Sequence, residues 1–136
     1  MKPEVETFCS FWSSLLDVPQ EQKQAFYLAL EAGMLTRCTG HWYPQAPVRG
    51  QALRSVIYDP AKGDIDDLLL AAAESIGISS DKLSKSLAIP KGAKFCQVWT
   101  DPGLVEVTYG PSQSIILYRQ QQFSPVAPAF NPYNYL

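Results

Sequence analysis

The stretch that decides the fold runs from residue 40 to residue 57 and reads GHWYPQAPVRGQALRSVI. It holds an aromatic cluster, two prolines and a glycine: His41, Trp42, Tyr43, Pro44, Pro47 and Gly50. Proline fixes φ and removes a backbone donor, so this stretch cannot continue a helix. Because it is too aromatic for a passive linker, we interpret it as the hinge between a helical half and a sheet half of the chain.

Before this hinge, the spacing of apolar residues predicts two helices. Pro3 suits a first helical position, and Pro19 ends the first helix and opens the second. Apolar residues recur at intervals of three and four, which is typical of one helix face: Val5, Phe8, Cys9, Trp12, Leu15 and Leu16, then Phe26, Ala29, Leu30, Gly33 and Met34. The short link favours an antiparallel helical hairpin, in which the small residues Ala29 and Gly33 would allow close approach.

After the hinge, an apolar run over residues 53–58 predicts a strand that Asp59-Pro60 closes. A turn over residues 59–64 follows. Asp64 is a plausible helix N-cap, with Asp66 and Asp67 in the first turn. One face of this helix is apolar, and Gly77 ends it. The residues of that face are Ile65, Leu68, Leu69, Ala72, Ala73 and Ile76.

The remainder predicts a short helix and three strands. Ser79 or Ser80 would cap the helix, and Ile89-Pro90 ends it. Residues 95–100 predict a strand, and residues 104–109 and 114–118 predict a β-hairpin whose turn is residues 110–113. Together these elements predict an α+β fold: a helical hairpin plus short helices packed on a small, mainly antiparallel β-sheet.

We place one domain at residues 1–118 and a C-terminal tail at residues 119–136. The tail is rich in glutamine, proline and aromatic residues and has neither helical nor strand periodicity, which predicts an extended segment. Its aromatic side chains leave two interpretations open. The tail is either a disordered end or a segment that docks on its own domain or on a neighbouring molecule.

Composition narrows the function classes. The 136 residues suit one domain with a real core, and the hydrophobic fraction of 46% is ordinary for a globular protein. The formal net charge is −2 and basic blocks are absent, which argues against direct binding of nucleic acid. The sequence also has no apolar run of the roughly 18 residues that a membrane span needs. Three cysteines suit a reducing compartment.

Catalytic and metal chemistry find little support in the sequence. Cys38 and His41 have a zinc-ligand spacing, but a structural zinc needs four ligands, and the other two cysteines are isolated. A Cys38–His41 nucleophile pair would need an orienting group and an oxyanion hole. We therefore expect the His41 ring to satisfy backbone groups where the second helix ends. The aspartates between 59 and 67 do not match a calcium loop, and we expect no cofactor and no enzymatic activity.

Two motifs resemble the signature boxes of the BTG/Tob antiproliferative family. The first is His41-Trp42-Tyr43-Pro44-x-x-Pro47-x-x-Gly50-Gln51-Ala52-x-Arg54. The second comprises Leu87-Ala88-Ile89-Pro90, Val98-Trp99-Thr100-Asp101-Pro102 and Val105. The resemblance implies a non-enzymatic adaptor that binds the catalytic deadenylase subunit of the mRNA-deadenylation complex. Such an adaptor promotes mRNA repression or decay and restrains proliferation or directs cell fate.

The resemblance also implies partners and a location. Other proteins, including RNA-binding proteins, would supply the specificity for RNA. The adaptor would work in the cytoplasm, the nucleus or both, without contacting nucleic acid or membrane directly.

The family's contact residues can be carried over by position. The tryptophan of the second box falls on Trp99, with Asp101 and Pro102 next to it. The family also has a contact aspartate at the start of the helix that follows the first box and its strand. This aspartate falls best on Asp66, with Asp64 as the second choice. The aromatic residue that precedes the first-box arginine is replaced here by Leu53. The other first-box residues, among them His41 to Pro44, Pro47, Gly50 and Arg54, are expected to be structural.

Several departures from the family pattern leave an alternative open. The chain has a few extra residues before the aspartate-capped helix and again before Trp99. It also has Gly103-Leu104 where the family usually has an aromatic residue and a glutamate. Because Leu53 removes a ring, deadenylase binding would be weakened, altered or lost. The alternative is a scaffold of the same fold that self-assembles or binds other regulatory proteins.

Overall fold

The computed structural model describes residues 1–110 and 112–121. Within them lie five helices and five strands, arranged as a helical half followed by a mainly β half. In chain order these are α1 (Lys2–Leu15), α2 (Gln20–Cys38), α3 (Gln51–Arg54), β1 (Val56–Asp59), β2 (Asp64–Ile65), α4 (Asp67–Ser75), α5 (Ser80–Ser86), β3 (Cys96–Asp101), β4 (Leu104–Tyr109) and β5 (Gln113–Arg119). The predicted α+β fold is confirmed.

The five strands form one antiparallel sheet in the order β2-β1-β3-β4-β5. Val56 of β1 pairs with Val98 of β3, and Trp99 pairs with Glu106 of β4. Side chains alternate between the two faces of a strand. Val98 is therefore directed to the helices and is buried, whereas Trp99 lies on the opposite face.

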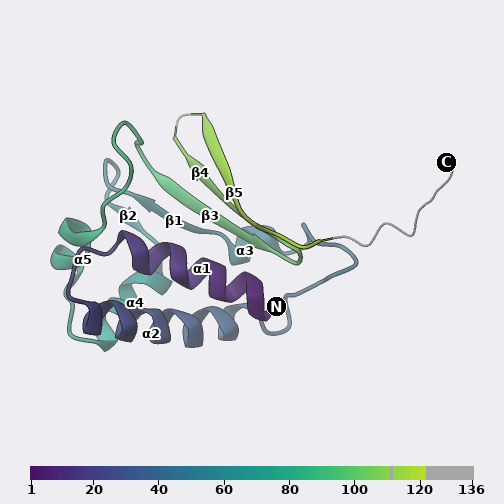
Figure 1. The fold of residues 1–136 in the computed structure, drawn as a ribbon, viewed down its shortest axis with the longest axis horizontal. Helices are drawn as coiled ribbons and strands as arrows, with labels where there is room; N and C mark the ends of the chain where they lie inside the picture. Colours follow the sequence, from purple (N-terminus) through teal and green to yellow (C-terminus); the bar gives the residue numbers. More distant parts are fainter. Residues whose placement is uncertain (111, 122–136) are drawn as a thin grey trace, which may run out of the picture.

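The helices cover one face of this sheet (Figure 1). α1 packs directly on β3, β4 and β5, and α2 runs antiparallel to α1 and packs on α1 and α4. This is the predicted helical hairpin. Over the described residues, the other face of the sheet carries no helix (Figure 1).

The core lies between the helices and the sheet and includes most of the predicted apolar helix faces. Its members are almost fully buried. They are Val5, Phe8, Cys9, Trp12, Leu16, Phe26, Leu30, Met34 and Cys38 from the helical half, and they include Val56, Leu69, Ala73, Ile78, Leu83, Cys96, Val98, Val105 and Val107 from the second half. Gly33 permits a close approach as expected, but the neighbour is α4 and not α1. A Cβ atom added at Gly33 would lie 2.5 Å from Leu68 Cδ1.

Two predicted boundaries after the hinge are wrong. Leu53 does not begin a strand, because Gly50 adopts the left-handed conformation (φ +76°) and starts the single helical turn α3, to which Leu53 belongs. Asp64 is not a helix N-cap, because it pairs with Asp59 in the short β1–β2 hairpin. The cap of α4 is Asp66, whose side chain accepts a hydrogen bond from Leu68 N. The alternative Ser79 cap of α5 is confirmed.

The final strand ends at Arg119, one residue beyond the predicted domain end at residue 118. The predicted tail over residues 119–136 lies mostly outside the described residues, as does Pro111 in the predicted hairpin turn. Over the part of the chain that the structure describes, no helix is both long enough and apolar enough to span a lipid bilayer.

Candidate partner-binding site

A buried arginine joins the two sequence boxes. Arg54 is fully buried, and its guanidinium group uses all five of its N–H donors. The acceptors are Thr100 O (2.8 Å from Nε), His41 O and Arg49 O (each 2.7 Å from Nη1), and Pro47 O and Asp101 Oδ1 (2.8 and 2.9 Å from Nη2). A buried charge is tolerated when it is paired and fully hydrogen-bonded. Arg54 therefore fixes the first-box loop to the end of β3.

Asp101 completes this network from the second box. It is only 4% exposed, and its second oxygen accepts a hydrogen bond from Gln51 Nε2 at 2.6 Å. We expected Asp101 to contact a partner, but the structure directs its carboxylate to groups inside the domain. Its role is to support the turn that presents Pro102. The sequence did not predict this contact of Gln51 with Asp101, although Gln51 lies within the first box.

The aromatic cluster of the first box packs around the arginines. The ring centroid of Trp42 lies 5.6 Å from Arg54 Cζ, and that of Tyr43 lies 4.3 Å from Arg49 Cζ. These are cation–π arrangements. Trp42 and Tyr43 thus pack against the two arginines within the domain.

The expected role of the His41 ring is wrong. It is the backbone of His41 that closes the end of α2, because its N–H donates to Cys38 O at 2.8 Å and its carbonyl accepts from Arg54. Among the hydrogen bonds between described residues, none involves the imidazole, and the residue is exposed.

The prolines of the two boxes meet at one groove. Pro44 and Pro47 from the first-box loop and Pro102 from the β3–β4 turn line a groove of about 720 Å³, together with the following residues: Gly103, Leu104, Arg119, Gln120 and Gln121. Pro102 thus lies beside first-box residues and not on a separate surface. The sequence alone did not predict this meeting, since it depends on the Arg54 network.

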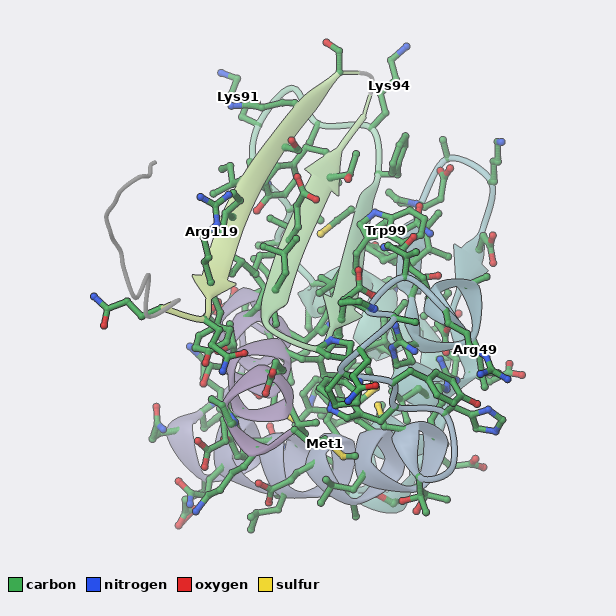
Figure 2. The ribbon with its side chains drawn as sticks, turned by 90° about the vertical axis from the view of Figure 1, so that its right-hand side faces the viewer. Met1, Arg49, Lys91, Lys94, Trp99 and Arg119 are labelled. Carbon is green, nitrogen blue, oxygen red and sulfur yellow. The ribbon has the colours of Figure 1, made fainter. Side chains whose placement is uncertain are left out.

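Trp99 lies on the uncovered face of the sheet. Figure 2 shows it on the sheet, above the helical layer, with Arg119 across the sheet on β5. Its ring is half-buried, and its Nε1–H donates to Thr108 Oγ1 on β4 at 3.1 Å. The hydrogen bond restricts the ring to one orientation while part of its surface stays accessible. Thr108 gave no signal in the sequence, because its partner becomes clear only from the strand register.

Leu53 and Asp66 lie on elements next to the strand that carries Trp99. Leu53 is 47% exposed on α3, which packs on β3. Asp66 follows β2, and its N–H donates to Ile57 O on β1, the neighbour of β3. Leu53 therefore lies on an element that packs on β3 itself, whereas Asp66 is linked to β3 through β1.

The Asp66 carboxylate already has partners within the domain. Arg37 of α2 donates to it twice, at 2.8 and 3.2 Å, and Leu68 N donates at 2.8 Å. The side chain of Asp66 retains 17% exposure, and that of Arg37 retains 22%. Arg37 was missed from the sequence, where it reads as an ordinary cation in the last turn of a helix.

The thiols do not support nucleophilic chemistry. Burial raises the pKa of Cys9 and of Cys96 to about 12, with the carboxylates of Glu31 and Glu6 adding to the effect at Cys9. Burial also raises the pKa of Cys38. All three thiols lie within the described residues and are not in disulfides. Over the same residues, no group of three or more His, Cys, Asp or Glu side chains is placed to hold a metal ion.

Comparison with known proteins gives a consistent result. A sequence model of the BTG family matches residues 1–119. A BTG family protein of Dictyostelium discoideum is 30% identical over 121 residues, which cover 85% of this chain and 26% of that protein. Protein BTG2 of Rattus norvegicus is 27% identical over 135 residues, 96% of this chain and 78% of its own length. The chain thus spans about a quarter of the Dictyostelium relative.

A solved structure shows the same fold. The BTG/Tob domain of C. elegans FOG-3 superposes with a TM-score of 0.72 at 16% identity, covering 88% of this chain and 90% of that domain. The fold and the linked boxes define a small α+β domain. The chain belongs to the BTG family. Membership of this family supports a regulatory protein of the BTG type.

Proposed function

We propose that this protein is an adaptor that binds the catalytic deadenylase subunit of the mRNA-deadenylation complex through Trp99, Leu53 and Asp66. It thereby promotes mRNA repression or decay and restrains proliferation or directs cell fate, in the cytoplasm, the nucleus or both. RNA-binding proteins select the messages. The binding domain comprises residues 1–118, and residues 119–136 form a separate tail.

The observation that carries this proposal is the setting of Trp99. A half-buried tryptophan held by one hydrogen bond, on a sheet face that no described helix covers, has the properties of a binding hot spot. The ring is rigid, so a partner would bury it with little loss of side-chain entropy. Trp12, by contrast, is a core tryptophan at 0% exposure.

Leu53 and Asp66 support the same surface. Leu53 lies beside β3 and is nearly half exposed, so a partner that binds Trp99 would also contact its apolar side chain at the edge of the interface. The Arg37–Asp66 pair is partly exposed and could exchange hydrogen bonds with a polar partner group. Because its charges are already satisfied, we expect this pair to contribute specificity more than affinity.

The test is direct calorimetric binding of the purified deadenylase subunit. We expect the wild type to bind and Trp99→Ala to bind at least about tenfold more weakly, since truncating a hot spot costs about 2 kcal/mol or more. The matched control is Leu28→Ala, which truncates a 54% exposed leucine on α2 and should leave affinity unchanged. Equal losses in both variants, or no binding by the wild type, would reject the adaptor.

A second variant tests whether Leu53 limits affinity. Leu53→Tyr adds a ring and a hydroxyl at an exposed position of α3, where the extra volume meets solvent. If Leu53 is in the interface, this variant should bind the deadenylase subunit more tightly than the wild type. Unchanged affinity would remove Leu53 from the site while leaving the Trp99 result intact.

One observation favours the alternative, a scaffold that self-associates. β5 is an edge strand, and its Ile115 and Ile116 are 45% and 44% exposed. Exposed apolar edge strands pair readily with other strands. Light scattering over a range of concentrations would show a rising mass, and Ile116→Lys would abolish the rise. A constant monomer mass would reject this scaffold.

A further inference from the structure

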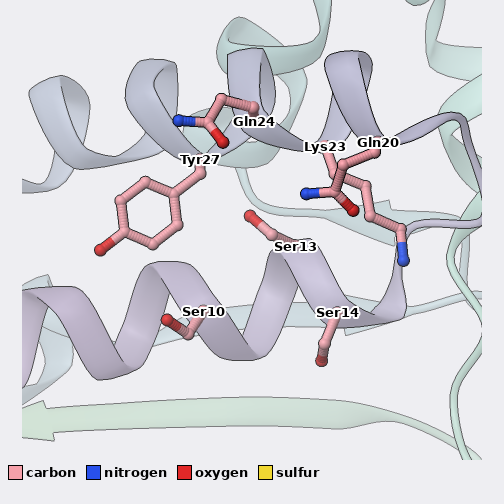
Figure 3. A pocket seen from close by; sticks show the side chains of 7 residues that line it. All are labelled: Ser10, Ser13, Ser14, Gln20, Lys23, Gln24 and Tyr27. Carbon is pink, nitrogen blue, oxygen red and sulfur yellow. The ribbon is translucent and has the colours of Figure 1, made fainter.

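A polar cleft between α1 and α2 lies apart from the residues assigned above. It has a volume of about 410 Å³ (Figure 3). α1 contributes three serines and α2 contributes longer polar side chains: Ser10, Ser13 and Ser14, and Gln20, Lys23, Gln24 and Tyr27. Neither Trp99 nor the first-box loop contributes to it, so it is independent of the proposed deadenylase surface.

Ser13 gives this cleft its chemical character. The residue is only 8% exposed, and its Oγ atom is buried without a hydrogen-bond partner among the described residues. Figure 3 shows its side chain directed from α1 into the space between the helices. By contrast, the exposed Ser14 donates to Phe11 O at 2.6 Å. Buried hydroxyl groups are nearly always paired, so an unpaired one that lines a cleft indicates a missing partner group.

The lining residues favour an anion. Lys23 is the one charged side chain among them, and it forms no ion pair with a described residue. The serine hydroxyls and glutamine amides can all donate hydrogen bonds, and no carboxylate lines the cleft. Such a set can satisfy the several acceptor oxygens of one oxyanion.

The charges around the cleft decide which end an anion would occupy. Burial raises the pKa of Tyr27, with Cys9 and the carboxylates of Glu31 and Glu6 adding to the effect. The Tyr27 end of the cleft is therefore the more negative one. Lys23 lies one helical turn away from Tyr27 and carries the positive charge of the lining, so an anion is favoured toward the Lys23 end of the cleft.

We propose that the α1–α2 cleft binds a phosphate group, with the Lys23 ammonium and the Ser13 hydroxyl as its main donors. The ligand class is a phosphate monoester, carried either by a small molecule or by a phosphoserine of another protein. The unpartnered Ser13 hydroxyl is then satisfied by a phosphate oxygen.

Amide chemical shifts in ¹⁵N-labelled full-length protein test the proposal, with inorganic phosphate as the probe and sodium chloride keeping the ionic strength constant. We expect saturable shifts confined to residues 10–14 and 20–27. Lys23→Gln should weaken binding about tenfold, since one charge-assisted hydrogen bond is lost. Lys82→Gln, on the exposed face of α5, is the matched control and should bind as the wild type does.

A second variant separates binding from folding. Ser13→Ala removes a hydroxyl that has no partner, so it should weaken phosphate binding without lowering the urea midpoint of unfolding. Tighter binding of a phosphoserine peptide than of inorganic phosphate would assign a protein ligand, and equal binding would assign a small molecule. Shifts that never saturate, or an affinity for phosphate that is unchanged in Lys23→Gln, would overturn the proposal, whatever Trp99→Ala does to deadenylase binding.

Discussion

Arg54 shows how one buried side chain at the end of a short helical turn can link two distant segments of a fold. Its five hydrogen bonds reach the first-box loop on one side and the end of β3 on the other. Two of its nitrogens each serve two acceptors, which the flat, forked guanidinium allows and an ammonium does not. The sequence marks this arginine only as a box residue. Its burial follows from the meeting of two segments that are far apart in the chain.

We predict that Arg54→Lys destabilises the protein by about 2–5 kcal/mol, because a lysine has three donors and would leave buried acceptors unsatisfied. The measurement is the urea midpoint of unfolding by circular dichroism. Arg49→Lys is the matched control, since Arg49 is exposed and stacks on Tyr43, and it should cost less than about 1 kcal/mol. Equal midpoints for the two variants would show that the network does not stabilise the fold.

At the scale of the elements, the helical half was predictable because it depends on local periodicity. The buried faces of α1 and α2 contain nearly all the residues that the spacing of three and four identified. The errors lie where backbone geometry replaces periodicity. Gly50 starts a helical turn that has no apolar periodicity from which it could be predicted. Asp64 was predicted to start a helix, but it pairs with Asp59 in the β1–β2 hairpin.

The candidate site was predictable in part, and for a related reason. The sequence pattern placed Trp99 on a strand and the resemblance named it as a contact residue, while the strand register accounts for its position on the uncovered face. Its restraint by Thr108 and the pairing of Asp66 with Arg37 depend on contacts between distant segments. Asp101 was assigned to a partner by the resemblance, because it stands close to Trp99 in the second box, whereas the structure pairs its carboxylate with Arg54 inside the domain.

The contact between α2 and α4 yields a prediction at this scale. Gly33→Val should destabilise the protein by about 1–3 kcal/mol, because a side chain there overlaps Leu68 and forces the Leu68 side chain out of its packed rotamer. Ala32→Val, on the exposed face of the same helix, is the control for the lower helix propensity of valine. Thermal unfolding of both variants measures the difference. A Gly33→Val variant as stable as Ala32→Val would mean that the two helices are not closely packed.

For the whole molecule, the buried thiols predict a loss of stability in alkali. The pKa values of Cys9 and Cys96 rise from 9.0 to about 12 on burial, so the unfolded state releases these protons first. Because the unfolded state then binds fewer protons than the folded state, the free energy of unfolding falls as pH rises from about 9 to 12. The raised pKa values of Tyr58 and Tyr109 act in the same direction.

Urea unfolding at a series of pH values measures this fall. The double variant Cys9→Ala, Cys96→Ala should show a shallower dependence on pH than the wild type, even if its stability at pH 7 is lower. A wild-type stability that stays level or increases between pH 9 and pH 11 would contradict the expectation.

The loop between α2 and α3 has no regular structure, yet Arg54 binds it to the sheet at three of its carbonyls. Opening that loop therefore leaves three N–H donors of a buried guanidinium unpaired, so the loop and the strand belong to one cooperative unit of unfolding. Its hydrogen-bonded amides, such as those of Ala46 and Arg49, should exchange with deuterium as slowly as amides of the central strands. A protein that binds beside this loop meets a surface that is ordered in advance, and little conformational entropy is lost when the complex forms.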